Sequence, residues 1–61
     1  MNTKYLGFKL KEGKKLRFES ILKAHGYKVC IDGEAIGEYN LIVYYTDEKQ
    51  IDQIEGLLSR I

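Results

Sequence analysis

The spacing of the apolar residues switches between two periods along this chain, and the switch limits the folds that it can adopt. Apolar and polar residues alternate in YLGFKL (5–10) and YKVCID (27–32), the pattern of strands with one buried face. YNLIVYYT (39–46) is apolar on both faces, as expected for a central strand. Residues 14–25 and 47–61 instead have the three- and four-residue spacing of helices. The predicted order of elements is therefore strand, helix, strand, strand, helix.

The first predicted helix has one apolar face and a defined end. Phe18, Ile21, Leu22 and His25 recur at helical spacing and share that face. Gly26 follows at once, where a helix commonly ends in the left-handed conformation that glycine adopts easily. We therefore expect His25 to lie in the last turn on the buried side, where it has a structural role beside the final carbonyl groups.

The second predicted helix begins at Thr46 or Asp47. Asp47 followed by Gln50 three residues later resembles a capping box, in which the two side chains bind each other's backbone N–H groups. Its spacing predicts a buried stripe with Leu57 beside it, and the stripe consists of Ile51, Ile54, Leu58 and Ile61.

General rules of chain connection turn this order into an α+β fold of two layers, βαββα. A strand–helix–strand unit crosses over with a right hand, and the third strand can return between the first two, giving the sheet order 1-3-2. Both helices then pack on one face, as in a ferredoxin-like fold that lacks its last strand. The first strand is left with an open outer edge, at which Lys4, Lys9 and Lys11 are of the type that discourages unwanted pairing.

The length and composition predict one globular domain over residues 1–61. The chain is 44% hydrophobic and 31% charged, and 61 residues are too few for a second core. No apolar run approaches the roughly 18 residues that span a bilayer, and MNTKYLGFKL at the start has no apolar signal region. A single cysteine cannot form an internal disulfide, which suits a reducing compartment. We therefore expect a cytoplasmic protein.

The net charge of +1 conceals two halves of opposite sign. Residues 1–30 hold eight Lys and Arg against two Glu, a balance of +6, whereas residues 31–61 hold two against seven Asp and Glu, a balance of −5. Such a division can serve an anionic partner or a basic one. It is equally compatible with two halves that pack together and partly neutralise each other.

The only histidine and the only cysteine lie close in sequence, followed by the acidic stretch DGEAIGE (32–38). Alternation points Cys30 away from the helices and therefore away from His25, so we expect no catalytic pair. One Cys and one His do not supply a zinc site. Asp32-Gly33 could form a tight hairpin turn, or the whole stretch could be a longer loop. As an acidic loop, Asp32, Glu34 and Glu38 lack the ligand pattern of a calcium loop. We predict no metal, no cofactor, no small-molecule substrate and no enzymatic activity.

The face of the sheet away from the helices is the more promising surface, because an uncovered apolar face usually has a partner. If Ile42 and Tyr44 point outward rather than Leu41, Val43 and Tyr45, the candidate binding residues for a protein partner or a homodimer are Tyr5, Lys9, Lys28, Cys30, Ile42 and Tyr44. A nucleic-acid-binding module is the alternative, because aromatic residues flanked by lysine resemble RNA-binding sheets. Its further residues would be Lys11, Lys14, Lys15 and Arg17. A third hypothesis is an inhibitor whose acidic half mimics nucleic acid.

Two resemblances to known families follow from short stretches of the chain. The pattern FESILKAHGYKVCIDGE…YNLIVYYTDEKQIDQIEGLLSRI resembles the small βαββα domains grouped as prokaryotic signal-transducing proteins, which are related in shape to nitrogen-regulatory PII-type proteins. This resemblance implies a cytoplasmic regulatory or carrier module and transfers no catalytic residue. LKAHGYKVCIDG also resembles the small toxin RNases of the HicA type. Those need a histidine shortly after the glycine, where this chain has Glu34 and Ala35, so their activity is not implied.

Overall fold

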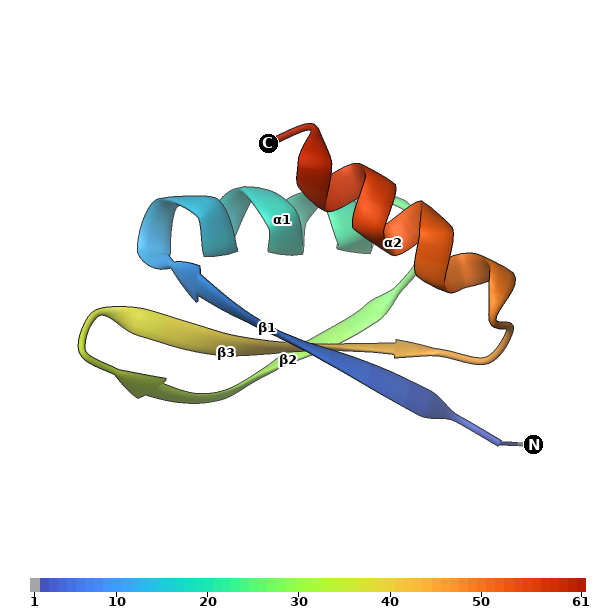
Figure 1. Ribbon diagram of the computed structural model, residues 1–61, viewed down its shortest axis with the longest axis horizontal. Coiled ribbons are helices and arrows are strands. Elements are labelled where there is room, and N and C mark those ends of the chain that lie inside the picture. The colour runs from blue at the N-terminus through green and yellow to red at the C-terminus, as the bar shows by residue number, and fades with distance from the viewer. Residues whose placement is uncertain (1) are drawn as a thin grey trace.

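The structure, a computed structural model, describes residues 2–61 and contains the five predicted elements in the predicted order (Figure 1). They are β1 (Lys4–Lys11), α1 (Glu12–Ala24), β2 (Lys28–Ala35), β3 (Glu38–Tyr45) and α2 (Lys49–Ser59). The sheet order is β1-β3-β2, and β3 pairs antiparallel with both neighbours. The α+β fold of βαββα order, with its 1-3-2 sheet, is therefore confirmed.

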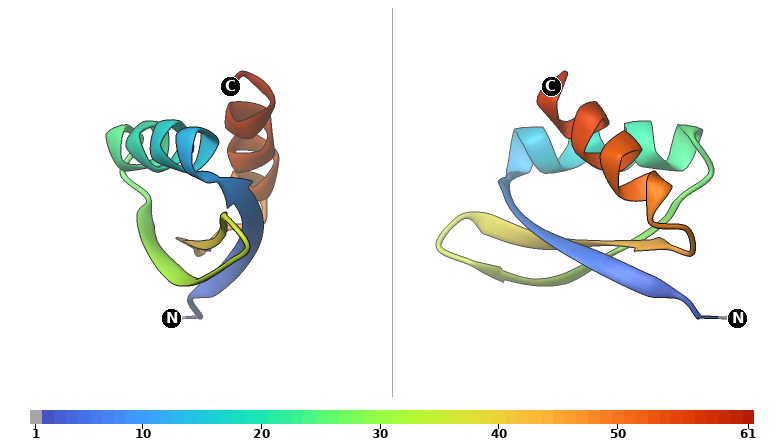
Figure 2. Two further views of the ribbon diagram at one scale, coloured as in Figure 1. Left: turned by 90° about the vertical axis from the view of Figure 1, so that its left-hand side faces the viewer. Right: turned by 45° about the vertical axis from the view of Figure 1, so that its right-hand side comes forward.

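The central strand divides its side chains between two environments. Leu41 and Val43 are fully buried and Tyr45 is buried, whereas Ile42 is half-buried and Tyr44 is exposed. Both helices lie on the same side of the sheet (Figures 1 and 2), so the first set faces the helices. The prediction that Ile42 and Tyr44 point to the open side is confirmed.

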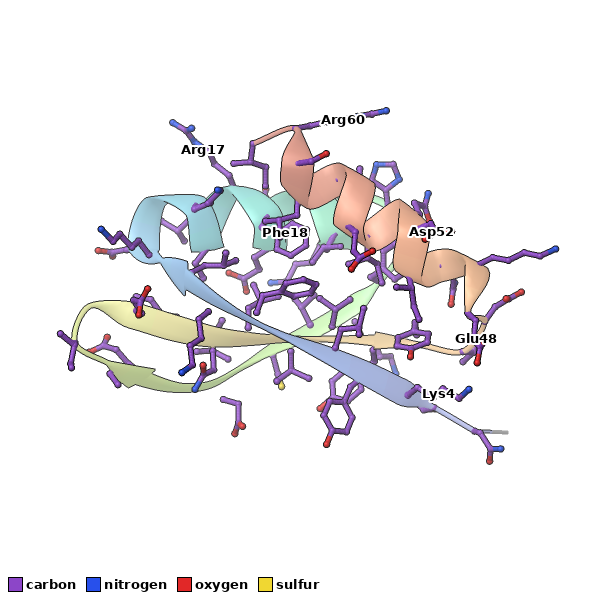
Figure 3. The ribbon with its side chains drawn as sticks, in the orientation of Figure 1. Lys4, Arg17, Phe18, Glu48, Asp52 and Arg60 are labelled. Atoms are coloured by element: carbon purple, nitrogen blue, oxygen red, sulfur yellow. The ribbon has the colours of Figure 1, made fainter. Side chains whose placement is uncertain are left out.

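The core lies between the sheet and the two helices. Phe18 and Leu22 of α1, Ile54 of α2 and Leu41 of β3 are all fully buried. The ring of Phe18 meets that of Phe8 edge to face, with centroids 5.3 Å apart, and it occupies the space between the layers (Figure 3). Burial of each such side chain stabilises the fold by about 1.5–3 kcal/mol. This layer of apolar contacts is what fixes the position of α1 and α2 over the sheet.

The capping box predicted for the second helix is formed only in part. Gln50 accepts from the Asp47 N–H as predicted, but the Asp47 carboxylate accepts from Lys49 rather than from Gln50, and the helix begins at Lys49. The Lys49 N–H donates to Asp47 Oδ1 at 2.9 Å, while the Asp47 N–H donates to Gln50 Oε1 at 3.1 Å. Its buried stripe differs in one detail from the prediction. Leu57 lies in the core with Ile54, whereas the remaining apolar residues of the stripe pack at its margin and are only partly buried: Ile51, Leu58 and Ile61. Residues three apart are neighbours on a helix surface, so Ile54 and Leu57 share the inner face.

The end of α1 corrects the prediction for His25. The Tyr27 N–H donates to the Leu22 carbonyl and the Gly26 N–H to the Lys23 carbonyl, both at 3.0 Å, and Gly26 has φ +87°. These two bonds form a Schellman motif, in which Tyr27 packs back over the helix end. Because buried Tyr27 takes that position, His25 is exposed rather than buried. The helix also begins earlier than predicted, at Glu12, directly after β1.

The connection between β2 and β3 also differs from the prediction. The hairpin turn is Ile36-Gly37, whose φ values of +53° and +77° match a two-residue turn with both central residues left-handed. Asp32-Gly33 is instead a β-bulge within β2, where these two residues lie opposite Asn40 and Gly33 has φ +115°. The prediction of an acidic loop is therefore wrong, because Asp32 and Glu34 belong to β2 and Glu38 belongs to β3.

We predict that Ile36→Asn stabilises the protein. Ile36 is fully exposed and β-branched, yet it has a left-handed backbone, which disfavours such residues by about 1–2 kcal/mol. Asparagine tolerates this conformation and precedes glycine in many turns of this type. We expect about 1 kcal/mol of added stability and a rise of roughly 4–8 °C in the thermal midpoint.

The control for this prediction is Ile36→Val, which keeps the β-branched strain and should leave the midpoint unchanged. Equal midpoints for Ile36→Asn and wild type in a thermal melt would show that the turn is not strained.

Candidate functional site

The open face of the sheet brings the predicted binding residues of the three strands together. Tyr5, Tyr44 and Lys28 lie side by side in register, one from each strand. Tyr5 is 67% exposed and Tyr44 is 36% exposed, so both rings offer surface to a partner. Tyrosine presents a large apolar area together with a polar tip and is enriched in protein interfaces.

The next rung along the sheet supplies an aliphatic centre. Ile42 lies between Gly7 and Cys30 in register. A Cβ added to Gly7 would come within 3.4 Å of Ile42 Cδ1, so the isoleucine side chain leans over the glycine. This arrangement leaves a shallow hollow of about 210 Å³, lined by Tyr5, Cys30, Asp32, Ile42 and Tyr44. We call these five residues the open-face cluster.

One polar contact orders the open-face cluster. Cys30 Sγ lies 3.5 Å from the Tyr44 hydroxyl, within hydrogen-bond distance for sulfur. This contact, followed by the charge that Cys30 can carry, raises the pKa of Tyr44 above 10.0. Desolvation and the charges of Asp32 and Tyr5 act in the same direction. The protonated phenol is therefore the form that this surface presents at neutral pH.

Charged residues surround the open-face cluster. Lys28 of β2 lies in the same row across the sheet as Tyr5 and Tyr44. Lys9 of β1 lies opposite Asn40, in the row on the other side of Ile42. Lys9 and Lys28 are both exposed. With Asp32 at the hollow, the face carries both signs of charge around an apolar centre, as in many protein interfaces. All six residues predicted for a protein partner therefore lie on one surface.

The histidine and the cysteine are not brought together. Cys30 lies on the open face, whereas His25 follows α1 and lines a separate hollow with Asp52 of α2 and with Arg60, which follows that helix. The backbone N–H of His25 donates to the Ile21 and Leu22 carbonyls at 3.1 Å, so the backbone of this residue completes the hydrogen bonding at the end of α1. Among residues 2–61, no three His, Cys, Asp or Glu side chains form a group that could hold a metal ion.

The three predicted loop carboxylates lie in different surroundings. Asp32 lines the open-face hollow, and Glu38 pairs in register with Lys11. Glu34 instead lies beside Tyr39 and raises the pKa of that phenol, first by accepting its hydrogen bond and then by repelling the phenolate. The bulge in β2 explains this separation, because the extra residue reverses the alternation of side chains beyond it.

Tyr39 also takes part in a contact that was not predicted from the sequence. Lys15 Nζ lies 4.6 Å from the centroid of the Tyr39 ring, a cation–π contact between α1 and β3. The signal was available, since Tyr39 alternates with the buried Leu41 and so faces the helices. Lys15 was predicted as a residue for nucleic acid, but here it packs on a side chain of its own protein.

The other basic residues of that alternative lie on different surfaces. Lys14 and Arg17 are exposed on α1, in the helical layer. Arg17 points away from the sheet, as does Arg60 (Figure 3). The two arginines line a hollow of about 390 Å³ with Ser20, Ile21 and Ile61. Lys11 ends β1 on the open side of the sheet, where it lies opposite Glu38. Lys14 and Arg17 therefore do not extend the open-face cluster into one basic surface.

Comparisons with known proteins were negative: no family model, curated protein or solved structure matches the chain. The resemblances to signal-transducing βαββα domains and to toxin RNases therefore stay predictions. Within residues 2–61, neither helix has the length and apolar sequence that crossing a membrane requires.

We predict that Cys30→Ala lowers the pKa of Tyr44 toward 10.0. The substitution removes the largest cause of the raised pKa, the contact with the thiol. Because the pKa in the folded protein lies above the unfolded value, the contact's stabilising effect is present below pH 10 and is lost as the pH rises through the folded pKa. An NMR titration of the tyrosine ring carbons measures the pKa directly.

Tyr5→Phe serves as the control for the pKa of Tyr44, because the Tyr5 charge is the weakest of the causes. We expect a smaller shift than with Cys30→Ala. An unchanged Tyr44 pKa in Cys30→Ala would show that the thiol does not bind the phenol in solution.

Proposed function

We propose that this protein is a small non-enzymatic binding module that acts through its open sheet face, and that it forms a homodimer through this face. The observation that carries the proposal is the open-face cluster, in which two exposed tyrosines and a half-buried isoleucine gather on the uncovered side of a two-layer fold. A contiguous apolar surface of this type is a mark of interaction sites.

A second copy is a suitable partner because the face is self-complementary in character. Its centre is apolar, and it carries the cations Lys9 and Lys28 as well as the carboxylate of Asp32. In a two-fold interface each contact occurs twice, so opposite charges on one face can pair reciprocally across the axis. Dimerisation also suits a chain of 61 residues, because a domain this small buries only about 60% of its unfolded surface.

A regulatory role agrees with this surface. If a foreign protein competes with the second copy for the open face, the fraction of dimer falls as the concentration of that protein rises. The dimer then reports the concentration of the partner. The resemblance to signal-transducing βαββα domains supports the same role. No residue of the open-face cluster is required to perform chemistry in this proposal.

The nucleic-acid alternative has less support. Its basic residues are divided between the sheet and the outer side of α1, and Lys15 is engaged with Tyr39. The inhibitor hypothesis is weakened similarly, since Asp32 and Glu34 lie in different surroundings. Salt dependence distinguishes these classes, because phosphate contacts weaken steeply with salt, whereas an apolar sheet interface is nearly indifferent to it.

We predict that Tyr44→Asp and Ile42→Asp each break self-association without unfolding the protein. A carboxylate in the centre of an apolar interface would be buried without a partner, so we expect the dimer to weaken by more than about tenfold. Sedimentation equilibrium at low and high salt measures the association, and circular dichroism checks the fold. The wild-type protein should be dimeric at both salt concentrations.

The matched control is Leu16→Asp, which makes the same chemical change at a leucine that is 54% exposed on α1. It should leave the dimer intact. A wild-type monomer at both salt concentrations, or a dimer that survives Tyr44→Asp, would contradict self-association through the open face.

A further inference from the structure

The outer edge of β1 is the one sheet edge with an unbroken backbone. β1 is an end strand of the sheet, and all eight of its residues pair with β3 in continuous register. The opposite edge, β2, is interrupted by the bulge between Ile31 and Glu34. Bulges twist an edge and prevent further pairing, whereas a regular edge strand offers a row of N–H and C=O groups to an added strand.

Two of the three apolar side chains on the helix side of β1 are covered incompletely, whereas the third, Leu10, is buried. Leu6 and Phe8 pack against the core but are only half-buried, whereas Leu41 and Val43 of the neighbouring strand are fully buried. The difference follows from position, because an end strand has a neighbour on one side only. A fourth strand with apolar side chains on the helix side would cover Leu6 and Phe8.

The charges of β1 select the occupant of this edge. The strand carries Lys4, Lys9 and Lys11 and no carboxylate. Lys4 Nζ lies 3.4 Å from a carboxylate oxygen of Glu48, the residue before α2, and Figure 3 shows both side chains at one end of the molecule. Lys9 and Lys11 alternate with the buried Leu10 and so lie on the open side of the sheet. A second copy of β1 would bring together two strands that each carry three lysines and no carboxylate, which is unfavourable, whereas an acidic strand would be attracted.

We propose that the outer edge of β1 binds an extended acidic segment of a partner protein, which adds a fourth strand to the sheet. Its apolar side chains face the helices and cover Leu6 and Phe8, and its alternate carboxylates lie on the open side beside Lys9 and Lys11. Main-chain hydrogen bonds hold the segment and the alternating side chains select it. This site uses the backbone edge of the sheet rather than its face, and Lys9 is the one residue that it shares with the proposed dimer surface.

The probe for this site is a synthetic peptide of about eight residues that alternates glutamate and valine. Its counterpart alternates lysine and valine. Titration of the isotope-labelled full chain, followed by backbone amide NMR, should give shifts concentrated on Lys4–Lys11 with the acidic peptide and much weaker binding with the basic one. The Tyr44→Asp variant should bind the acidic peptide as the wild type does. Peptide binding at the edge can therefore be judged even if the protein does not form a dimer through the open face.

Charge reversal makes the test specific. The double variant Lys9→Glu/Lys11→Glu should bind the acidic peptide about tenfold more weakly and should gain affinity for the basic peptide. Its matched control, Lys14→Glu/Arg17→Glu, changes the net charge equally at exposed positions on α1 and should bind as the wild type does.

Three outcomes would overturn the proposal. The first is equal binding of both peptides by the wild-type protein, and the second is equal weakening by the two double variants. The third is a set of shifts on Lys4–Lys11 of the Tyr44→Asp variant, in which the face dimer is broken, that depends on the concentration of the protein alone; this result would assign the edge to a second copy.

Discussion

The packing of Leu41 and Val43 against the helices is the interaction on which the rest of the structure depends. Both side chains come from the central strand and are fully buried, as are Phe18 and Leu22 of α1 and, across the core, Ile54 of α2. Successive side chains of a strand point to opposite faces. Fixing Leu41 and Val43 inward therefore fixes Ile42 and Tyr44 outward, on a side that the helices leave uncovered. The fold and the candidate site thus have one common cause.

The overall topology could be predicted because it depends on periodicity and on few connection rules. The change from a spacing of two to helical spacing located β1, β2 and both helices, and a continuous apolar run located β3. The pair Asp47 and Gln50 marked the segment just before α2. What periodicity could not decide was the direction of β3, whose residues are apolar on both faces. Packing decided it, because the inner set meets the large side chains of the helices.

The local errors of the sequence analysis have identifiable causes. Asp-Gly is a strong signal for a hairpin turn, but a bulge also needs a glycine with positive φ, and Gly33 serves that role instead. Ile36-Gly37 was overlooked as a turn because a β-branched residue rarely adopts a left-handed backbone. The Schellman motif likewise placed Tyr27, rather than His25, over the end of α1.

The faces of the sheet on which side chains lie were predicted correctly where alternation held and wrongly beyond the bulge. Tyr5, Cys30, Ile42 and Tyr44 lie in regular parts of the sheet, and they form the expected cluster. Glu34 lies beyond the bulge, where one inserted residue changes the face of those that follow. Its contact with Tyr39 therefore could not be obtained from spacing alone.

The most direct test of the central claim is an isotope-filtered NMR experiment on a mixture of labelled and unlabelled protein. It detects contacts between copies only, so it shows which surface the second copy covers. Our account predicts intermolecular contacts from the rings of Tyr5 and Tyr44 and from the methyl groups of Ile42. Contacts confined to Leu16 and its neighbours on α1, or to the outer edge of β1, would contradict it.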